Sequence, residues 1–218
     1  MFWRRERYQF HLDEDIPLST PLDRLSFIVL DTETTGFAIT GEDRLLEIGA
    51  VCVDNLQVTD ATFQTYVNPR RDIPNVIKEL TGIDEQKVKQ APESKAALDG
   101  LFAFIESHQC NFLAGHYLIF DISLIEQELK RANCTCSKPK SIDTLDLLRL
   151  LNICIQGKQL EDYAADFDIS LSGRHTAIGD AIITANLACQ LLKCLQRRYR
   201  TWGELLFAFE SRKRTFGG

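Results

Sequence analysis

The residues best placed to do chemistry begin with two carboxylates after a short hydrophobic run. Residues 27–30 (Phe-Ile-Val-Leu) predict a buried strand, and Asp31 and Glu33 follow it. Side chains alternate between the two faces of a strand, so these carboxylates, two positions apart, point to the same side. Like charges held together repel unless a cation lies between them, and hard divalent cations prefer oxygen ligands. The spacing therefore predicts a cation site.

Three more candidates lie further along the chain. Asp121 follows a short predicted strand at 111–114, and His175 and Asp180 lie at the start of a long predicted helix over 176–195. Asp180 falls near the apolar stripe of that helix, where an unpaired carboxylate is costly, so a metal or a basic partner is implied. Four carboxylates and one histidine suit a two-metal phosphodiester hydrolase in which the histidine accepts the proton of the attacking water.

Each candidate also has a purely structural alternative. Asp31 could be a turn residue at a strand end, Asp121 could be a helix N-cap, and His175 could be a polar loop residue. The same-face position of Glu33 favours the cation site over the turn.

The elements that must position these residues are three strands followed by alternating helices and strands. The predicted strands are near 27–33, 45–53, 58–67, 111–114 and 140–142, and the predicted helices are near 74–80, 92–108, 120–132, 143–151, 158–167 and 176–195. The short links between the first three strands predict an antiparallel meander. The expected fold is α/β, with a mixed five-stranded sheet flanked by helices.

Composition narrows the class of protein. With 218 residues, 44% of them hydrophobic, the chain can bury one substantial core. A net charge of -6 argues against binding nucleic acid by a broad basic surface, although an enzyme can hold phosphates through metal ions. No apolar run approaches the roughly 20 residues that span a bilayer, and no signal peptide is evident, so we expect a cytoplasmic protein with no membrane contact. The 7 cysteines lack zinc-site spacing and are expected to be free thiols.

Five segments, in order, resemble the motifs of one family, the DEDDh-type 3′–5′ exonucleases, and above all the epsilon-type proofreading subunits and domains of bacterial DNA polymerase III. The segments are Asp31-Thr32-Glu33-Thr34-Thr35-Gly36, Leu45-Leu46-Glu47-Ile48-Gly49-Ala50-Val51, Leu80-Thr81-Gly82-Ile83, Gly115-His116 to Phe120-Asp121, and Arg174-His175-Thr176-Ala177 to Asp180-Ala181. The likeness spans about residues 25–195.

The resemblance implies a ribonuclease H-like fold and the release of nucleoside monophosphates from single-stranded 3′ ends, with DNA favoured and proofreading or repair as the role. It implies two Mg²⁺ or Mn²⁺ ions held by the four acidic residues Asp31, Glu33, Asp121 and Asp180. It implies His175 as the general base and places Glu33 near the terminal 3′-hydroxyl as well. Substrate contacts are expected from Thr34, Thr35, Gly36, His116 and Tyr117.

One position departs from the family pattern. Tyr117 stands where the family commonly has asparagine after Gly115-His116. Tyrosine is larger and can stack on a base, so we expect the chemistry to survive and the placement of the substrate strand to differ. Two other functions stay open: an exoribonuclease for RNA ends or short oligonucleotides, and a non-catalytic adaptor that keeps the fold for protein contacts.

The two ends of the chain flank the predicted nuclease. We expect an N-terminal extension over 1–24 (a tail or an early helix), an exonuclease domain over 25–197, and a C-terminal helix with a basic tail over 198–218. Apolar residues between Trp202 and Phe209 predict an amphipathic helix that packs on the extension. The alternative is that it binds a partner, such as a polymerase.

Overall fold

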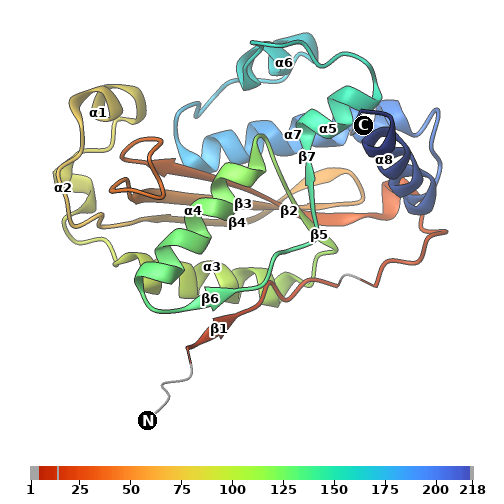
Figure 1. Cartoon of the computed structure of the whole chain (residues 1–218). Helices are drawn as coiled ribbons and strands as arrows, with labels where there is room; N and C mark the ends of the chain where they lie inside the picture. Colours follow the sequence, from red (N-terminus) through yellow and green to blue (C-terminus); the bar gives the residue numbers. More distant parts are fainter. Residues whose placement is uncertain (1–4, 14, 217–218) are drawn as a thin grey trace.

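A computed structural model describes residues 5–13 and 15–216, and its centre is one mixed five-stranded sheet (Figure 1). The strand order is β4-β3-β2-β5-β7. The strands are β2 (Ser26–Thr34), β3 (Leu45–Asp54), β4 (Gln57–Tyr66), β5 (Phe112–Gly115) and β7 (Ser141–Asp143). The meander β2-β3-β4 is antiparallel, whereas β5 and β7 join it in parallel. The predicted fold class is confirmed.

The parallel pairing of β2, β5 and β7 determines where the candidate site residues lie. β2, β5 and β7 run in the same direction, so their carboxyl ends meet at one edge of the sheet. Asp31 and Glu33 lie near the end of β2, His116 follows β5, and Asp143 ends β7. Segments more than a hundred residues apart in sequence therefore converge on this edge.

Helices cover both faces of the sheet (Figure 1). The helices are α1 (Asn75–Thr81), α2 (Glu85–Val88), α3 (Ser94–His108), α4 (Leu118–Arg131), α5 (Thr144–Leu150), α6 (Leu160–Asp166), α7 (Ala177–Leu195) and α8 (Trp202–Phe216). Phe27 and Val29 of β2 pack in the cluster formed with α5 to α8, whereas Ile28 and Leu30 pack in the cluster with α3 and α4. This alternation predicts that Asp31 and Glu33 face α7.

A buried ion-pair network fixes α4 to the sheet. Glu128 of α4 is 1% exposed, and both of its carboxylate oxygens accept hydrogen bonds from Arg44, at 2.8 and 2.9 Å. Arg131 donates a further bond of 2.8 Å to the same carboxylate. A buried charge is tolerated only when it is paired in this way. The network holds α4, and with it Asp121, against the start of β3.

The described part of the N-terminal extension is extended and packed rather than helical. β1 (Arg7–Tyr8) pairs in parallel with β6 (Thr135–Cys136), and Phe10 lies 4.8 Å from Phe102 between ring centroids. A 3₁₀ turn, η1 (Leu22–Arg24), leads into β2. The pairing of β1 with β6 is non-local and only two residues long, so no sequence period announces it. Residues 1–4 and 14 of the predicted extension lie outside the described residues.

The C-terminal helix packs on the extension, as predicted. The backbone N–H groups of Trp202 and Gly203 donate to the carbonyls of Thr20 and Leu18, each at 2.8 Å. Trp202 is 2% exposed, and its ring stacks on that of Phe112 at 5.4 Å between centroids. α8 thus closes one end of the core beside α5. Residues 217–218 of the predicted tail are outside the described part of the chain.

Helix α7 is the core helix of the domain. It is the one described helix whose length and mean hydropathy would let it cross a bilayer, but 67% of that window is buried inside the fold. It packs across β2, β3 and β4 on one face of the sheet. Its apolar surface is thus used in covering the sheet, which matches the buried stripe predicted from the sequence.

Candidate active site

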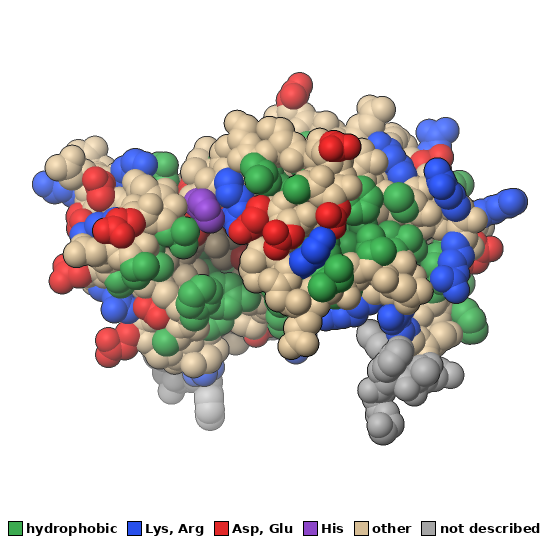
Figure 2. All heavy atoms as spheres, turned by 90° about the horizontal axis from the view of Figure 1, so that it is seen from above, with side chains coloured by type: hydrophobic (Ala, Val, Ile, Leu, Met, Phe, Trp, Pro, Cys, Tyr) green, Lys and Arg blue, Asp and Glu red, His purple; other side chains and the backbone are tan. Residues whose placement is uncertain are grey.

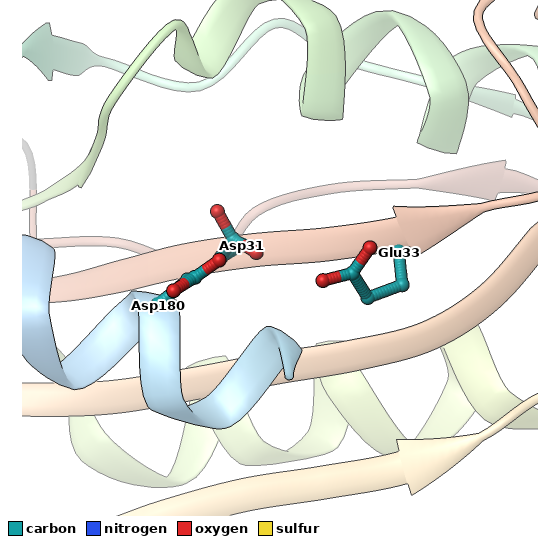
Figure 3. A group of neighbouring side chains, drawn as sticks. All are labelled: Asp31, Glu33 and Asp180. Atoms are coloured by element: carbon teal, nitrogen blue, oxygen red, sulfur yellow. The ribbon is translucent and has the colours of Figure 1, made fainter. Parts of the chain in front are cut away.

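Three of the predicted carboxylates converge above the end of β2. Oxygens of Asp31, Glu33 and Asp180 can be chosen that all lie within 4.8 Å of one another. Figure 3 shows Asp31 and Glu33 rising from β2 toward Asp180, which comes from the first turns of α7. Asp31 lies inside β2 rather than at a turn, so the structural alternative for it is wrong.

Asp121 reaches the site from the other face of the sheet. Thr32, which lies between the two β2 carboxylates and faces the opposite side, donates a 2.5 Å hydrogen bond to Asp121 Oδ1. Asp121 is 4% exposed and falls in the first turn of α4, where Tyr117 is the N-cap. The N-cap alternative is therefore wrong. Asp121 stands beside the three-carboxylate group, close enough for its charge to raise the pKa of Asp31.

The start of α7 is seated directly on β3. Gly49 pairs with Asp31 across the β2–β3 ladder, and a Cβ added to Gly49 would lie 2.2 Å from the carbonyl carbon of Ala177. Only glycine permits this approach. Glu47, fully buried, accepts a 3.0 Å bond from the Ala177 N–H, and Thr176 caps the helix by accepting from the Gly179 N–H at 3.1 Å. These contacts bring Asp180 over Asp31.

The loop before α7 adds a cation that the sequence reading did not single out. Arg174 Nη1 donates to Asp180 Oδ2, and Arg174 Nη2 donates to Glu161 Oε2 of α6 at 2.8 Å. The loop packs closely on the start of α7. A Cβ added to Gly179 would lie 1.8 Å from the Gly173 carbonyl oxygen, so only glycine permits this approach. The sequence predicted a metal or a basic partner for Asp180, and Arg174 is a basic partner.

The electrostatics of the site are those of crowded carboxylates. Burial raises the pKa of Asp31 well above its ordinary value, and the nearby charges of Asp121 and Asp180 raise it further. Burial and Asp180 raise the pKa of Glu33 to about 8. Burial raises the pKa of Asp121 to about 7 against the lowering effect of the Thr32 hydrogen bond. The charge of Arg174 lowers the pKa of Asp31 and Glu33 but does not cancel the repulsion.

This donor set fits divalent cations. Asp180 Oδ1 is buried and has no hydrogen-bond partner among the described residues, as expected of an oxygen that serves a metal. Carboxylate oxygens are the ligands that Mg²⁺ and Mn²⁺ prefer. Figure 2 shows one face of the domain, on which acidic and basic side chains lie near a hollow.

His175 lies in the same loop, between Arg174 and the α7 N-cap. Its backbone is left-handed, with φ 66°, and its side chain is half-buried. It is thus a loop residue, and a hydrogen bond from its backbone to Asp180 holds it beside that carboxylate. Its charge interacts with Asp180 and Glu161.

The turn after β2 is rigid. Thr34 Oγ1 donates to the Gly36 carbonyl at 2.6 Å, and Thr35 Oγ1 donates to Asp43 Oδ1 at 2.9 Å. A Cβ on Gly36 would lie 2.5 Å from Asp43 Oδ2. The N–H groups of Thr35 and Gly36 are also paired, with the Arg44 carbonyl at 2.9 Å and with Thr34 Oγ1 at 3.2 Å, so both side-chain and backbone bonds hold the turn.

His116 and Tyr117 occupy different environments although they are adjacent. His116 Nδ1 lies 2.7 Å from Thr144 Oγ1, while its Nε2 is buried with no hydrogen-bond partner among the described residues. Burial and the charge of Arg174 lower the pKa of His116 to about 4, so the ring is neutral. Tyr117 is 52% exposed, and its N–H points at Asp143 Oδ1 at 3.3 Å. The Tyr117 side chain is therefore accessible, whereas that of His116 is partly buried against Thr144.

A large cavity lies elsewhere on the domain. It measures about 890 Å³ and is lined by β7, α5, α8 and the loop after α5. None of the four predicted carboxylates lines it, and Tyr117 is its one residue from the predicted site. The chemistry of the carboxylate cluster, rather than the size of this cavity, identifies the candidate active site.

Two of the residues that the sequence reading missed were visible in the motifs. Gly49 and Glu47 lie in the segment matched to the second strand, and a glycine inside an otherwise apolar strand signals close approach of another backbone. Arg174 directly precedes His175, but no local pattern reports that its partners are Glu161 and Asp180. Those contacts depend on how the loop folds over α7.

Comparison with known proteins identifies the family of the chain. A family model described as Exonuclease matches residues 28–188. The chain belongs to this family and is an exonuclease domain. Its fold is the ribonuclease H-like fold of the DEDDh exonucleases: the nuclease domain of 3′hExo, a DEDDh family member, superposes with a TM-score of 0.69 at 18% identity, covering 78% of this chain and 92% of that one.

Relatives in sequence are much longer proteins. The chain is 36% identical over 191 residues to a DNA polymerase III PolC-type protein of Caldanaerobacter subterraneus subsp. tengcongensis, covering 86% of this chain and 13% of that protein. It is 27% identical over 176 residues to the 3′–5′ exonuclease DinG of Bacillus subtilis, covering 81% and 18%. A DNA polymerase III subunit epsilon-like protein of Rhodobacter capsulatus is 32% identical over 211 residues, covering 93% and 29%. The chain thus spans less than a third of each of these relatives.

Proposed function

We propose that this domain is a metal-dependent 3′–5′ exonuclease that releases nucleoside monophosphates from single-stranded 3′ ends, with DNA favoured. The observation that carries the proposal is the convergence of Asp31, Glu33 and Asp180 within 4.8 Å, beside Asp121. Such a concentration of ionised groups is unfavourable without cations. Membership of the exonuclease family supports the reaction class.

The four carboxylates would hold two Mg²⁺ or Mn²⁺ ions. Asp31 is central, because the charges of Asp121, Asp180 and Glu33 all act on it. Two such ions, when bound, lower the pKa of the attacking water and stabilise the leaving 3′-oxygen. Asp180 offers the buried, unpartnered Oδ1 to this site.

The chain's own groups move the proton and place the substrate. His175, in the loop beside Asp180, accepts the proton of the attacking water on an imidazole nitrogen, so activity falls in acid when the ring is protonated. The turn at Thr34, Thr35 and Gly36 receives the terminal nucleotide. Glu33 lies at the end of the same strand, where it meets the terminal 3′-hydroxyl as well.

Exposed apolar side chains beside the site suit a single-stranded substrate. Phe37 is 86% exposed, and its ring lies 5.9 Å from that of Phe120. Ile119 and Tyr117, from the start of α4, are 68% and 52% exposed. Hydrophobic side chains also gather on one rim of the hollow in Figure 2. Bases stack on such surfaces with little regard to sequence.

The test is a 3′-shortening assay with purified protein, a 5′-labelled single-stranded DNA oligonucleotide and Mn²⁺. We expect stepwise shortening that is abolished by EDTA, reduced at least about a hundredfold by Asp180→Asn, and strongly reduced by His175→Ala. Asp60→Asn, an exposed carboxylate on β4, is the matched control and is expected to retain full activity. A rate unchanged by Asp180→Asn would refute the assignment of the site, and equal rates for His175→Ala would remove the histidine as base.

RNA is the alternative substrate. One of the structural neighbours is described as bound to rAMP and another as an exonuclease in complex with duplex DNA, so the fold serves both sugars. Rates on matched DNA and RNA oligonucleotides decide between the two. Faster shortening of RNA would reassign this domain to RNA ends or short oligonucleotides.

We also propose that the domain works in the cytoplasm with a polymerase partner. Its relatives named DNA polymerase III PolC-type carry the matching region within far longer chains. The test is a pull-down from native lysate with the wild type and with a Phe207→Ser variant. Phe207 is a side chain of α8 that is 74% exposed, so a loss of binding by the variant would identify that helix as the contact. Binding of no polymerase by either form would count against the partnership.

A further inference from the structure

Arg174 occupies a position that the two-metal proposal does not explain. Its guanidinium bridges two carboxylates from different helices, Asp180 of α7 and Glu161 of α6. The bond to Glu161 is 2.8 Å long, and Arg174 is ion-paired with Asp180 as well. The Asp180 side chain is 7% exposed, whereas that of Glu161 is 40% exposed. The arginine therefore links an interior carboxylate of the cluster to one at the surface.

The positive charge of Arg174 acts on the whole cluster rather than on one partner. It lowers the pKa of Asp31, of Glu33 and of Asp180. Arginine stays protonated under all ordinary conditions, so this charge cannot be discharged. When cations are absent, Arg174 supplies positive charge to all three of these groups.

A single guanidinium and two divalent cations compete for the same negative charge. The five carboxylates Asp31, Glu33, Asp121, Asp180 and Glu161 carry five negative charges when all are ionised, and Arg174 with two divalent cations carries five positive ones. The complete set is therefore neutral overall, and Arg174 beside Glu161 leaves the charge of Asp180 to a cation. With Arg174 against Asp180, a cation on Asp180 would face a positive charge at close range in a poorly screened interior.

We propose that Arg174 is the internal counter-ion of the cation-free site: its guanidinium shields Asp180 until a divalent cation displaces it onto Glu161. This inference rests on the proposed metal-dependent function and adds a regulated step to it. Glu161 is the acceptor that makes the exchange feasible, because Arg174 moves from two partners to one without becoming unpaired. The buried Asp180 Oδ1, with no partner among the described residues, is the oxygen that an incoming cation meets first.

The exchange has a consequence that a purely structural role lacks. If Arg174 competes with the cation, removing its charge must tighten cation binding. If Arg174 only holds Asp180 in place, removing it must weaken cation binding. The two roles therefore predict opposite signs for the same measurement.

The experiment is calorimetric titration of Mn²⁺ into EDTA-stripped protein at pH 8. For Arg174→Gln we expect a dissociation constant about tenfold smaller than that of the wild type, the effect of one close charge pair. For Glu161→Gln we expect weaker binding, because Arg174 loses its second partner and stays on Asp180. The double variant is expected to bind like Arg174→Gln, since Glu161 acts only through the arginine.

Stability supplies a second measurement. In EDTA, Arg174→Gln is expected to melt below the wild type because the carboxylates lose their counter-ion, and saturating Mn²⁺ is expected to close that gap. Arg149→Gln is the matched control, since Arg149 pairs with Asp146 within α5 and is expected to leave Mn²⁺ binding unchanged.

Equal or weaker Mn²⁺ binding by Arg174→Gln would overturn the proposal. If that variant does not fold without metal, Glu161→Gln decides alone, and binding as tight as the wild type would overturn it. The 3′-shortening assay is read separately. Mn²⁺ binding that follows these expectations without any shortening would refute the proposed function and leave the counter-ion in place.

Discussion

Neutralising Glu33 is expected to stabilise the cation-free protein while abolishing its activity. Burial and the charges of Asp180 and Glu47 raise the pKa of Glu33 to about 8 from 4.5. The folded state therefore binds a proton more tightly than the unfolded chain does. It follows that the stability of the cation-free protein falls as pH rises from about 4.5 to about 8, because the folded protein must then carry an unfavourable charge.

The size of the effect follows from the same pKa values. A difference of one pKa unit corresponds to about 1.4 kcal/mol, so the ionisation of Glu33 costs the folded state up to about 1 kcal/mol at pH 5 and about 4 kcal/mol at pH 8. Glu33 is partly exposed, and solvent screening reduces both figures by roughly half. Glu33→Gln keeps the shape of the side chain and removes this cost.

The assay is urea denaturation in EDTA at pH 5 and pH 8, with Asp60→Asn as the control on an exposed carboxylate. We expect Glu33→Gln to be more stable than the wild type by about 2 kcal/mol at pH 8 and by less than about 1 kcal/mol at pH 5. In saturating Mn²⁺ the order is expected to reverse, because the wild type binds the cation better. Equal stability of the two proteins at pH 8, or a gain independent of pH, would refute the electrostatic account of the site.

Two further predictions concern the seat of α7 and the cations. Gly49→Ala places a Cβ 2.2 Å from the carbonyl carbon of Ala177, so we expect a loss of roughly 1–3 kcal/mol in urea denaturation and a rate reduced by about a hundredfold as Asp180 moves away from Asp31. Gly157→Ala is the control: its added Cβ meets nothing within 4 Å, but its φ of 86° strains alanine, so we expect it to lose stability and keep its rate. Equal rates for the two variants would show that Gly49 does not position the site. Mn²⁺ is expected to raise the melting temperature of the wild type more at pH 8 than at pH 5, because protons compete with the cation for the raised-pKa carboxylates; an increase independent of pH would contradict those pKa values.

The sheet and the order of the helices could be predicted because local pattern reports them. Apolar alternation and helical spacing placed the strands of the sheet and the long helices α3, α4 and α7 within a few residues of their observed bounds. The pattern did not report β1, β6 or α2, which are two to four residues long and depend on contacts with distant parts of the chain. Short elements carry too few residues to show a period.

Some of the candidate site residues could also be predicted from the sequence. Asp31 and Glu33 share a face because strand side chains alternate, and that follows from their spacing alone. The sequence could also mark Asp121, His175 and Asp180 as candidates by their places beside predicted elements. It could not measure how closely they approach, since a distance between β2 and α7 depends on how the helix packs on the sheet.

Only the tertiary structure determined how the four carboxylates lie relative to one another. Packing at Gly49 brought Asp180 over Asp31, while the hydrogen bond from Thr32 drew Asp121 to the side of the group. The folded loop before α7 placed Arg174 against Asp180. Burial and mutual repulsion then raised the pKa values, and both depend on solvent exclusion by the whole domain, which no local stretch of sequence contains. Residue types and periodicity thus determined what chemistry was available, and packing determined which charges must share the same small space.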